Sequence, residues 1–509
     1  MTNILEYLEN TIKTIKNPDK PAFVSEDKSL SFRKLDILSR SCGSYFALRS
    51  MRKQPVAVFM QKSPDTIAAF LGVVYSGNYY IPLDPDIPAF RIKKILETVK
   101  PEYIICDDVT LPIIEKWRID TPDFNYPTAL FCELSKNPID NDMLMDIRKN
   151  AIDVDPAYVV FTSGSTGVPK GVVATHRSVI DYIENLCPVL DVDENTVFGN
   201  QSPLYLDACL KEIFPTLKFG CSAYLIPQSL FMFPVKLVEY INEKGINTIC
   251  WVASALSLVA GLGTLDAAVP KSLHTIAFGS EVFPTNYYNK WRDALPETRF
   301  IHLYGPTEAT GMSCYFETKK KYASDESIPI GHPFPNTEII LLDEDGNTPQ
   351  QGEAGEICIR GAGLSIGYFG DSEKTAEVFV QNPQSKFPDT IYKTGDLGCR
   401  GSDGELYYIS RRDHQIKHMG YRIELAEIDL MAVDLDGVSL VCTIFDDIKS
   451  KIVLYYMSDS VSKSEIKAYL KENLPRYMQP HNINKLDQMP RTPGGKIDRV
   501  ELLRMHRER

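Results

Sequence analysis

The sequence lacks several features that would assign it to a class at once. Its eleven cysteines include no CxxC pair and no Cys/His cluster with the spacing of a zinc site. No apolar window of about 20 residues is present, so no membrane-spanning helix is expected. The N-terminal segment carries acidic residues early and no apolar run, unlike a secretory signal peptide. These absences predict a cytoplasmic protein with free thiols and no membrane association.

The sequence also has fewer basic than acidic residues. The chain has 55 Lys and Arg against 67 Asp and Glu, a net charge of -12, which argues against a nucleic-acid partner. No internal repeat, low-complexity segment or Gly/Ser linker interrupts the 509 residues. Apolar content of 44% and charged content of 24% are typical of a globular protein that can form a large core and a smaller second domain.

Short apolar runs alternate with amphipathic segments over the first 305 residues. The runs expected to be strands are 55–60, 103–108, 157–161, 222–227, 248–253, 274–279 and 300–305. The segments expected to be helices are 63–77, 176–186, 234–244, 254–261 and 285–293. Such alternation predicts a parallel sheet, whose binding sites lie at the carboxyl ends of its strands.

The pattern changes from about residue 325. Residues 338–361 read as two strands joined by an acidic turn, which indicates a β-rich subdomain. Residues 413–509 contain both helix and strand patterns. The expected fold class is therefore α/β: a large N-terminal domain of parallel α/β layers with a β-rich subdomain, residues 1–412, and a small α+β domain, residues 413–509.

One stretch has a composition that favours the binding of an anion. Residues 161–176 read FTSGSTGVPKGVVATH, rich in Gly, Ser and Thr, with Lys170 after Pro169. Small residues let several backbone N–H groups converge on an anion, and hydroxyls and a lysine add donors. We interpret the stretch as a phosphate-binding loop, with a flexible surface loop as the alternative. It is not a Walker A motif, because Lys170 does not directly follow a glycine.

Further motifs follow in a fixed order. They are YGPTE at 304–308, TGD at 394–396, RRDHQIKHMGYRIE at 411–424 and GGKIDR at 494–499, preceded by LSFRKLD at 30–36 and NYYIPLDPDIP at 78–88. With the glycine-rich stretch, this order resembles the adenylate-forming superfamily. The closest match is to the amino-acid adenylation domains of nonribosomal peptide synthetases, and the chain is also similar to D-alanine–carrier protein ligases.

The resemblance implies a two-step ligase reaction. A carboxylate is joined to AMP from ATP with Mg²⁺, pyrophosphate is released, and the acyl group passes to a thiol. For an adenylation domain, the substrate is an α-amino acid and the acceptor is the phosphopantetheine thiol of an acyl or peptidyl carrier protein. The implied ATP-binding residues are Thr162, Ser163, Gly164, Ser165, Thr166, Gly167, Lys170, Gly279, Ser280, Glu281, Tyr304, Gly305, Asp396 and Arg411.

The implied catalytic residues are Lys496, Thr307 and Glu308. Lys496 would bridge the attacking carboxylate and the α-phosphate, where a single ammonium stabilises the gathered negative charge. Thr307 would lie near the α-phosphate, and Glu308 would bind Mg²⁺, which prefers hard oxygen ligands. Tyr304 would stack on adenine, and Asp396 would accept both ribose hydroxyls with help from Arg411.

The resemblance also makes the C-terminal domain mobile. Asp413 matches the hinge, although Ser410 stands where the family usually has glycine. Lys417, Gly420 and Arg422 would belong to a loop that faces the substrate only during thiol transfer. The domain would present Lys496 first and this loop second.

The substrate pocket is implied by motif spacing. Asp207 falls where amino-acid-activating members pair an aspartate with the α-ammonium group, and Phe278 and Met312 would narrow the pocket. The implied pocket residues are Asp207, Ala208, Lys211, Cys250, Ile276, Phe278, Leu303, Gly311 and Met312. Lys211 is unusual among them, because an unpaired lysine is costly in an apolar pocket. It either binds an acidic or polar substrate side chain, pairs with Asp207, or lies outside the pocket.

Two alternatives stay open from the sequence. An acyl-CoA or aryl-acid ligase would share the chemistry but usually lacks an aspartate at position 207, and a non-catalytic nucleotide-binding module would not need Lys496, Asp396 and Glu308 together. Only ten residues follow Arg499, and neither a GGxS carrier motif nor an HHxxxDG condensation motif is present. We therefore expect a monomer whose carrier is a separate domain or protein.

Overall fold

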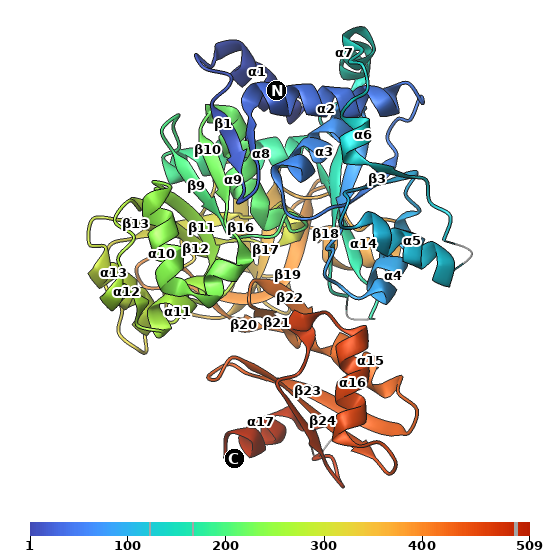
Figure 1. Cartoon of the computed structure of the whole chain (residues 1–509). Helices are drawn as coiled ribbons and strands as arrows, with labels where there is room; N and C mark the ends of the chain where they lie inside the picture. Colours follow the sequence, from blue (N-terminus) through green and yellow to red (C-terminus); the bar gives the residue numbers. More distant parts are fainter. Residues whose placement is uncertain (122–123, 165–166, 493–496, 509) are drawn as a thin grey trace. The chain divides into compact units, whose positions relative to one another are not determined.

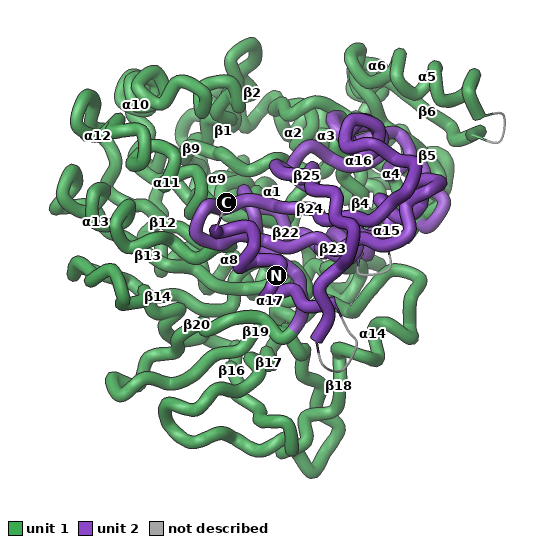
Figure 2. Tube along the Cα trace, turned by 90° about the horizontal axis from the view of Figure 1, so that it is seen from below, with its two compact units in different colours: residues 1–85, 99–160, 171–412 green, residues 86–98, 161–170, 413–509 purple. Residues whose placement is uncertain are grey.

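The computed structural model describes residues 1–121, 124–164, 167–492 and 497–508. The chain divides into two compact units, coloured separately in Figure 2. The first contains residues 1–85, 99–160 and 171–412, and the second contains 86–98, 161–170 and 413–509. The phosphate-loop segment thus groups with the C-terminal residues.

The first unit contains two large sheets with mostly parallel strands (Figure 1). Sheet A has the order β15 (His332–Pro333), β14 (Cys314–Thr318), β13 (Arg299–Tyr304), β12 (Thr275–Gly279), β11 (Thr248–Val252), β9 (Val197–Asn200), β10 (Ser222–Leu225), β1 (Pro21–Val24) and β2 (Ser29–Ser31). Sheet B has the order β6 (Thr128–Leu130), β5 (Tyr103–Cys106), β3 (Pro55–Phe59), β4 (Tyr79–Pro82), β7 (Pro156–Thr162) and β8 (Lys170–Thr175). The predicted parallel α/β class is confirmed.

Helices of the first unit cover these sheets. They are α1 (Leu5–Thr14), α2 (Phe32–Ala47), α3 (Pro64–Tyr75), α5 (Leu111–Asp120), α6 (Phe131–Leu134), α7 (Asn141–Asn150), α8 (His176–Leu190), α9 (Leu210–Phe219), α10 (Pro234–Glu243), α11 (Ala253–Gly261), α12 (Thr264–Ala267), α13 (Thr285–Ala294) and α14 (Ser372–Val378). Their starts follow local sequence rules. Ser63 caps α3 by accepting from the backbone N–H of Thr66, and Thr175 and Ser178 form a capping box at α8.

The two faces of sheet A pack against different helices. One hydrophobic cluster joins Cys250, Ala277 and Leu303 of sheet A to α8, α9 and strands of sheet B. A second cluster joins Ile276 and Phe278 to α10, α11 and α13, which lie together in Figure 1. Since neighbouring residues of a strand point to opposite faces, the strands β11, β12 and β13 each contribute to both clusters.

The predicted β-rich subdomain is also present in the first unit. It is an antiparallel sheet with the order β16 (Thr337–Leu342), β17 (Gly355–Gly361), β19 (Thr390–Arg400) and β18 (Phe379–Gln381), and with β20 (Leu406–Arg411) paired to β19. Short one-turn elements η1 (Asp207–Cys209), η2 (Gln228–Met232) and η3 (Thr307–Ala309) complete the unit.

The second unit is a small α+β assembly. Its strands are the hairpin β21 (Gln415–His418) and β22 (Tyr421–Glu424), and the sheet β23 (Val438–Asp446), β24 (Lys451–Ser458) and β25 (Asn482–Lys485). Its helices are α4 (Ala89–Val99, of which 89–98 belong to this unit), α15 (Leu425–Val433), α16 (Lys463–Asn473), η4 (Arg476–Met478) and α17 (Arg499–Arg507). The predicted mixture of helix and strand is confirmed here.

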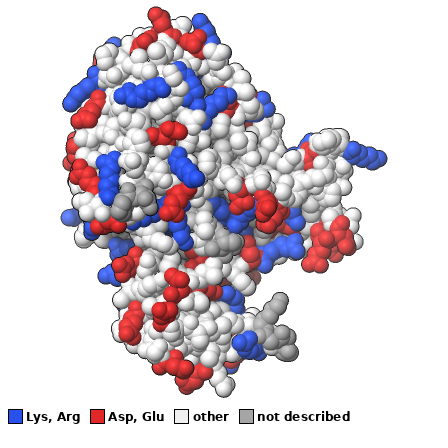
Figure 3. Space-filling view, turned by 90° about the vertical axis from the view of Figure 1, so that its right-hand side faces the viewer, with Lys and Arg blue, Asp and Glu red and all other residues white. Residues whose placement is uncertain are grey.

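Two sequence-based expectations about composition can be compared with the structure. Each of the eleven cysteines, all among the described residues, is a free thiol, as expected. Within the described parts of the chain, no helix combines the length and apolarity needed for a membrane span. On the face drawn in Figure 3, Lys and Arg side chains are interspersed with Asp and Glu.

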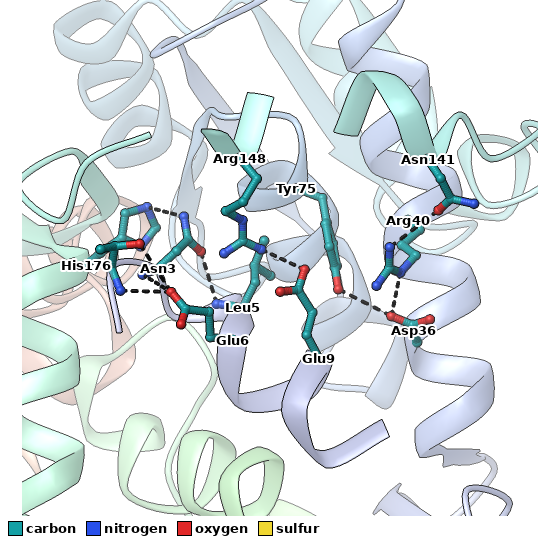
Figure 4. Close-up of polar contacts among 11 residues, drawn as sticks. Asn3, Leu5, Glu6, Glu9, Asp36, Arg40, Tyr75, Asn141, Arg148 and His176 are labelled. Carbon is teal, nitrogen blue, oxygen red and sulfur yellow. Dashed lines mark hydrogen bonds and ion pairs between the residues drawn. The ribbon is translucent and has the colours of Figure 1, made fainter. Parts of the chain in front are cut away.

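The N-terminal helix α1 is fixed to the first unit by buried polar contacts (Figure 4). The side-chain amide of Asn3 donates to Nε2 of His176 over 3.2 Å, and Arg148 forms an ion pair with Glu9 at 2.7 Å. His176 is only 4% exposed. Burial, followed by the nearby Arg148 guanidinium, lowers the pKa of His176 to about 4. The imidazole is therefore neutral in the folded chain at neutral pH.

This depressed pKa predicts a loss of stability in mild acid. Between about pH 6.5 and 4 the unfolded chain binds a proton at His176 that the folded chain does not, so stability falls as pH falls through that window. From pH 7.5 to 5, His176→Gln should lose about 2 kcal/mol less free energy of unfolding than the wild type. Urea unfolding followed by tryptophan fluorescence measures this, with the exposed His332→Gln as control. Equal pH dependence in wild type and His176→Gln would contradict the assignment.

Candidate functional site

The YGPTE segment begins at the carboxyl end of β13, where parallel sheets place their sites. Gly305 is required there by a close approach of the chain. A Cβ at Gly305 would lie 2.4 Å from the carbonyl oxygen of Gly311 and 2.7 Å from the backbone nitrogen of Ser313. The tight fold of 305–313 places Thr307 and Glu308 in η3, directly beyond the strand.

Tyr304, Asp396 and Arg411 form one buried cluster. The Tyr304 hydroxyl donates to Oδ2 of Asp396 over 2.7 Å, and Nη1 of Arg411 lies 2.5 Å from Oδ1. The ion pair is almost completely buried, with side-chain exposures of 9% for Arg411 and 2% for Asp396. Burial, followed by the Asp396 carboxylate, raises the pKa of the Tyr304 phenol. Three predicted nucleotide-binding residues from β13, β19 and β20 thus lie together.

Glu308 is fully buried and held by a residue that the sequence did not indicate. The Tyr368 hydroxyl donates to Oε1 of Glu308 over 2.8 Å, and the two residues are 60 positions apart. Among the described residues no group of three or more His, Cys, Asp and Glu side chains is arranged to hold a metal ion. A single carboxylate suits Mg²⁺ that is bound mainly by substrate phosphates, so Glu308 fits its predicted role.

Asp207 lies beside Thr307 and Glu308. The nearby side chain of Thr307 lowers the pKa of its carboxyl group, which also interacts electrostatically with Lys211 and Glu308. Burial is the largest influence and raises the pKa of Asp207. The predicted ammonium-binding carboxylate and the predicted phosphate-side hydroxyl are therefore direct neighbours, although 100 residues separate them in the sequence.

The strand register of sheet A separates two of the predicted pocket residues from the others. Cys250 of β11 pairs with Ala277 of β12, and Gly279 pairs with Leu303 of β13. Ile276 and Phe278 therefore point to the opposite face of the sheet from Cys250 and Leu303, because side chains alternate along a strand. Both pack with α10, α11 and α13 instead. The predicted pocket residues are thus divided between the two faces of sheet A, and the part that each plays in substrate binding stays a prediction.

Ala277 and Gly279 take their place on the Cys250 face. Ala277 belongs to the same cluster as Cys250, Leu303 and Met312. A Cβ at Gly279 would lie 2.2 Å from the carbonyl oxygen of Leu303, so glycine is needed for the two strands to approach. The face of sheet A that carries Cys250 thus has small residues at Ala277 and Gly279, and Phe278 lies on the other face.

Gly311 and Ala208 are two further small residues among the predicted pocket positions. A Cβ at Gly311 would lie 2.9 Å from the ring of Tyr182 on α8, which leaves no room for a larger residue there. Ala208 belongs to η1, between Asp207 and the start of α9, and is partly exposed.

Charged side chains are concentrated where α9 begins. Lys211 is 2% exposed and Glu212 is fully buried. Glu212 Oε2 accepts from the side-chain amide of Asn200 over 3.2 Å, and burial raises the pKa of Glu212 to about 7. Lys62 donates from Nζ to the carbonyl oxygens of Asn200 and Gln201 over 3.1 and 3.2 Å. Burial lowers the pKa of Lys62 to about 8, while Glu212 opposes that effect. The sequence patterns did not indicate Lys62 or Glu212.

The predicted GSE segment shapes a helix start. Oε2 of Glu281 accepts from the backbone N–H of Ser254 over 2.9 Å, in the first turn of α11. Ser280 adopts a left-handed conformation with φ 66°, which is uncommon for a residue with a side chain. These contacts fix the turn that follows β12.

The phosphate-loop segment is described within the second unit. Ser163 Oγ donates to the carbonyl oxygen of Arg422 over 2.6 Å, and Lys170 Nζ lies 3.7 Å from Oε1 of Glu424. Gly164 allows a tight turn, because a Cβ there would lie 2.0 Å from the carbonyl oxygen of Val168. Predicted residues Thr162 and Gly167 flank this turn, and Gly167 has a φ of 74°. The loop connects β7 to β8, so a strand, not a helix, follows it directly.

The predicted thiolation loop is the β21–β22 hairpin. Lys417 pairs with Arg422 across the hairpin, and Met419 and Gly420 form its two-residue turn with φ angles of 53° and 81°. Positive φ at both positions is typical of a type I′ turn. The predicted hinge residue Asp413 accepts at Oδ1 from the backbone N–H of Gln415 over 3.1 Å. Ser165, Thr166 and Lys496, also predicted as site residues, lie outside the described residues.

Comparison with known proteins identifies the family. The profile described as AMP-binding enzyme matches residues 13–369. The chain belongs to the AMP-binding enzyme family. The predicted resemblance to the adenylate-forming superfamily is confirmed.

Similar proteins are large synthases and synthetases. The chain is 30% identical over 495 residues to gramicidin S synthase 1 of Brevibacillus brevis, covering 96% of this chain and 43% of that protein. It is 29% identical over 503 residues to polyketide synthase PksN of Bacillus subtilis (strain 168), covering 96% of this chain and 9% of that protein. This AMP-binding enzyme thus spans less than half of the length of both relatives.

A solved structure shares the fold. Holo-PA1221, a nonribosomal peptide synthetase protein with adenylation and PCP domains bound to a vinylsulfonamide inhibitor, matches with a TM-score of 0.83 and 24% identity. The match covers 99% of this chain and 84% of that chain. It confirms the fold class of this AMP-binding enzyme.

The contribution of the buried Asp396–Arg411 ion pair to the stability of the first unit can be tested by substitution. Arg411→Met leaves a buried carboxylate without its cation and should cost about 3–5 kcal/mol of unfolding free energy. Adding Asp396→Asn should recover much of this loss, because the uncompensated charge is removed. Trp117, Trp251 and Trp291 all lie in the first unit, so tryptophan fluorescence in urea reports its unfolding. Strictly additive effects of the two substitutions would contradict a direct pair.

Proposed function

We propose that this AMP-binding enzyme adenylates an α-amino acid and then transfers it to the phosphopantetheine thiol of a carrier protein. In the first step a carboxylate oxygen of the amino acid bonds to the α-phosphorus of ATP while the bond to pyrophosphate breaks. In the second step the thiol sulfur, losing its proton, bonds to the acyl carbon while AMP leaves.

The contact between Asp207 and Thr307 carries the proposal. Asp207 provides a partly buried carboxylate for the substrate ammonium, and the Thr307 side chain lies beside it. The amine and the reacting carboxylate of an α-amino acid are separated by a single carbon. An ammonium bound at Asp207 therefore brings the carboxylate next to Thr307 and the segment assigned to the phosphates. A fatty or aryl acid has no group that would require this aspartate.

The described residues fit ATP and Mg²⁺. The buried Asp396, held by Tyr304 and Arg411, retains lone pairs that can accept ribose hydroxyls. Glu308 would hold Mg²⁺, which when bound neutralises charge on the phosphates. Thr162 to Lys170 would supply N–H, hydroxyl and ammonium donors to the β- and γ-phosphates. Within the second unit, Lys170 lies near Glu424, so phosphate binding at Lys170 would replace that contact.

The domain roles belong to the same proposal. Residues 1–412 would bind ATP and the amino acid, and residues 413–509 would move about Asp413 to present Lys496 and then the Gly420 hairpin. The presence of adenylation and PCP domains in the structural neighbour holo-PA1221 supports a carrier-protein partner. A monomeric enzyme without nucleic-acid or membrane partners is our working expectation.

Lys496→Ala should lower amino-acid-dependent ATP–pyrophosphate exchange by about 10²–10³, because one ammonium no longer stabilises the transition state. Binding of ATP itself, measured by calorimetry, should remain nearly unchanged. Lys485→Ala, which changes another lysine of the C-terminal residues 413–509, is a matched control and should retain exchange. Wild-type exchange in Lys496→Ala would exclude this lysine as the catalytic residue.

Asp207→Asn tests the amino-acid assignment. The substitution keeps the shape but removes the charge that binds the ammonium, so KM for the amino acid should rise at least about 100-fold. The panel should contain the twenty amino acids, their D-forms, and several aryl and fatty acids. Exchange that depends on an aryl or fatty acid and is insensitive to Asp207→Asn would overturn the amino-acid assignment.

A further inference from the structure

Lys62 bonds to the strand that leads into the candidate substrate site. It lies in the turn between β3 of sheet B and α3, and its ammonium donates to the backbone carbonyl oxygens of Asn200 and Gln201 over 3.1 and 3.2 Å. Asn200 is the last residue of β9 in sheet A. A single side chain therefore joins the carboxyl ends of strands from two sheets, and this is the edge at which parallel sheets place their sites.

The turn that carries Lys62 is fixed on both sides. The backbone N–H of Gln61 donates to Oδ2 of Asp107, directly after β5, over 2.7 Å. Ser63 caps α3 by accepting from the backbone N–H of Thr66. Because the residues before and after Lys62 are held in this way, its ammonium projects from a rigid base and can fix the end of β9 relative to sheet B.

The segment that follows β9 has few other polar anchors. The carbonyl oxygen of Asn200 also accepts from the backbone N–H of Ile226 over 3.0 Å, but among the described residues Lys62 is the only donor to the carbonyl oxygen of Gln201. Oε1 of Gln201 and Oγ of Ser202 are buried without a hydrogen-bond partner in the described part of the chain. The path of this segment therefore depends on the Lys62 ammonium.

The same segment leads to Asp207, and a second link closes the loop on which Asp207 lies. The side-chain amide of Asn200 donates to Oε2 of Glu212, in the first turn of α9, over 3.2 Å. The Glu212 charge also stabilises the Lys62 ammonium, since it opposes the lowering of the Lys62 pKa by burial. Lys62, Asn200 and Glu212 thus form one polar connection from the end of β3 to α9.

We propose that Lys62 is a positioning residue for the amino-acid substrate. By holding the end of β9, it determines where Asp207 lies beside Thr307, and it acts on the substrate only through Asp207. This inference rests on the proposed function, in which Asp207 binds the substrate ammonium. A displacement of about 1 Å in a group that orients a substrate can cost about 100-fold in rate, so a distant anchor of Asp207 can have a large effect.

Lys62→Met removes the ammonium and tests this role in ATP–pyrophosphate exchange. The amino acid used is the one with the highest kcat/KM in the exchange panel. Its KM should rise about 10-fold or more, because hydrogen bonds from a charged group are lost. The KM for ATP should stay nearly unchanged, since Tyr304, Asp396 and Arg411 are held by their own contacts. Lys62→Arg, which keeps the charge and the donors, should recover part of the loss.

Lys28→Met is the matched control. Lys28 also belongs to the first unit, but its ammonium pairs with Asp65 on α3 instead of with β9. Both KM values should therefore stay at the wild-type level in Lys28→Met. Calorimetric binding of ATP checks that each variant is folded. If Lys62→Met does not fold, Lys62→Gln gives the same comparison, because its shorter amide keeps a polar group but removes the charge.

A double-mutant cycle distinguishes positioning from a general structural role. If Lys62 acts through Asp207, adding Lys62→Met to Asp207→Asn should raise the KM for the amino acid no further than Asp207→Asn alone. Additive effects, an equal rise in the KM for ATP, or a wild-type KM in Lys62→Met would overturn the positioning role and leave adenylation intact. Wild-type enzyme that shows no exchange with any amino acid would overturn the proposed function and this inference together.

Discussion

The register of β11, β12 and β13 is the constraint on which the site depends. These parallel strands end at the same edge of sheet A, and their pairing decides which side chains face α8 and α9. Because the strand period is two residues, a shift of one position would exchange the pocket face for the α10–α13 face. Gly279 fixes this register sterically, since only glycine permits the close approach of Leu303.

Buried charge is the second organising feature. Asp396 is matched by Arg411 and by the Tyr304 hydroxyl, and Glu308 is held by Tyr368. These groups are oriented before any ligand binds, which lowers the cost of organising the site around substrates. Lys211 also lies among acidic groups, because Asp207 and Glu212 interact with it electrostatically.

Much of the fold follows from local patterns. Alternating apolar runs and amphipathic helices predicted the parallel sheets, and the acidic turn within 338–361 predicted the β16–β17 pair. Capping residues such as Ser63 mark helix starts in a single sequence. The short strand β8 was missed, since Lys170–Thr175 follows the glycine-rich loop and reads as part of it. Ordered motifs likewise indicated Tyr304, Asp396 and Arg411 as nucleotide-binding residues, and the structure brings these three together.

The sequence by itself determined the chemistry available to this protein: a glycine-rich anion-binding loop, ordered motifs, an aspartate at 207 and a lysine at 211. The tertiary structure decided which of these groups meet. Tyr368 donates to Glu308, which is 60 positions away in the sequence. Lys62 donates to the backbone carbonyl of Asn200 at the end of β9, more than 130 positions away. Pairing register and long-range contacts depend on how whole elements pack, and no local pattern encodes them. The same packing placed Ile276 and Phe278 on the opposite face of sheet A from Cys250.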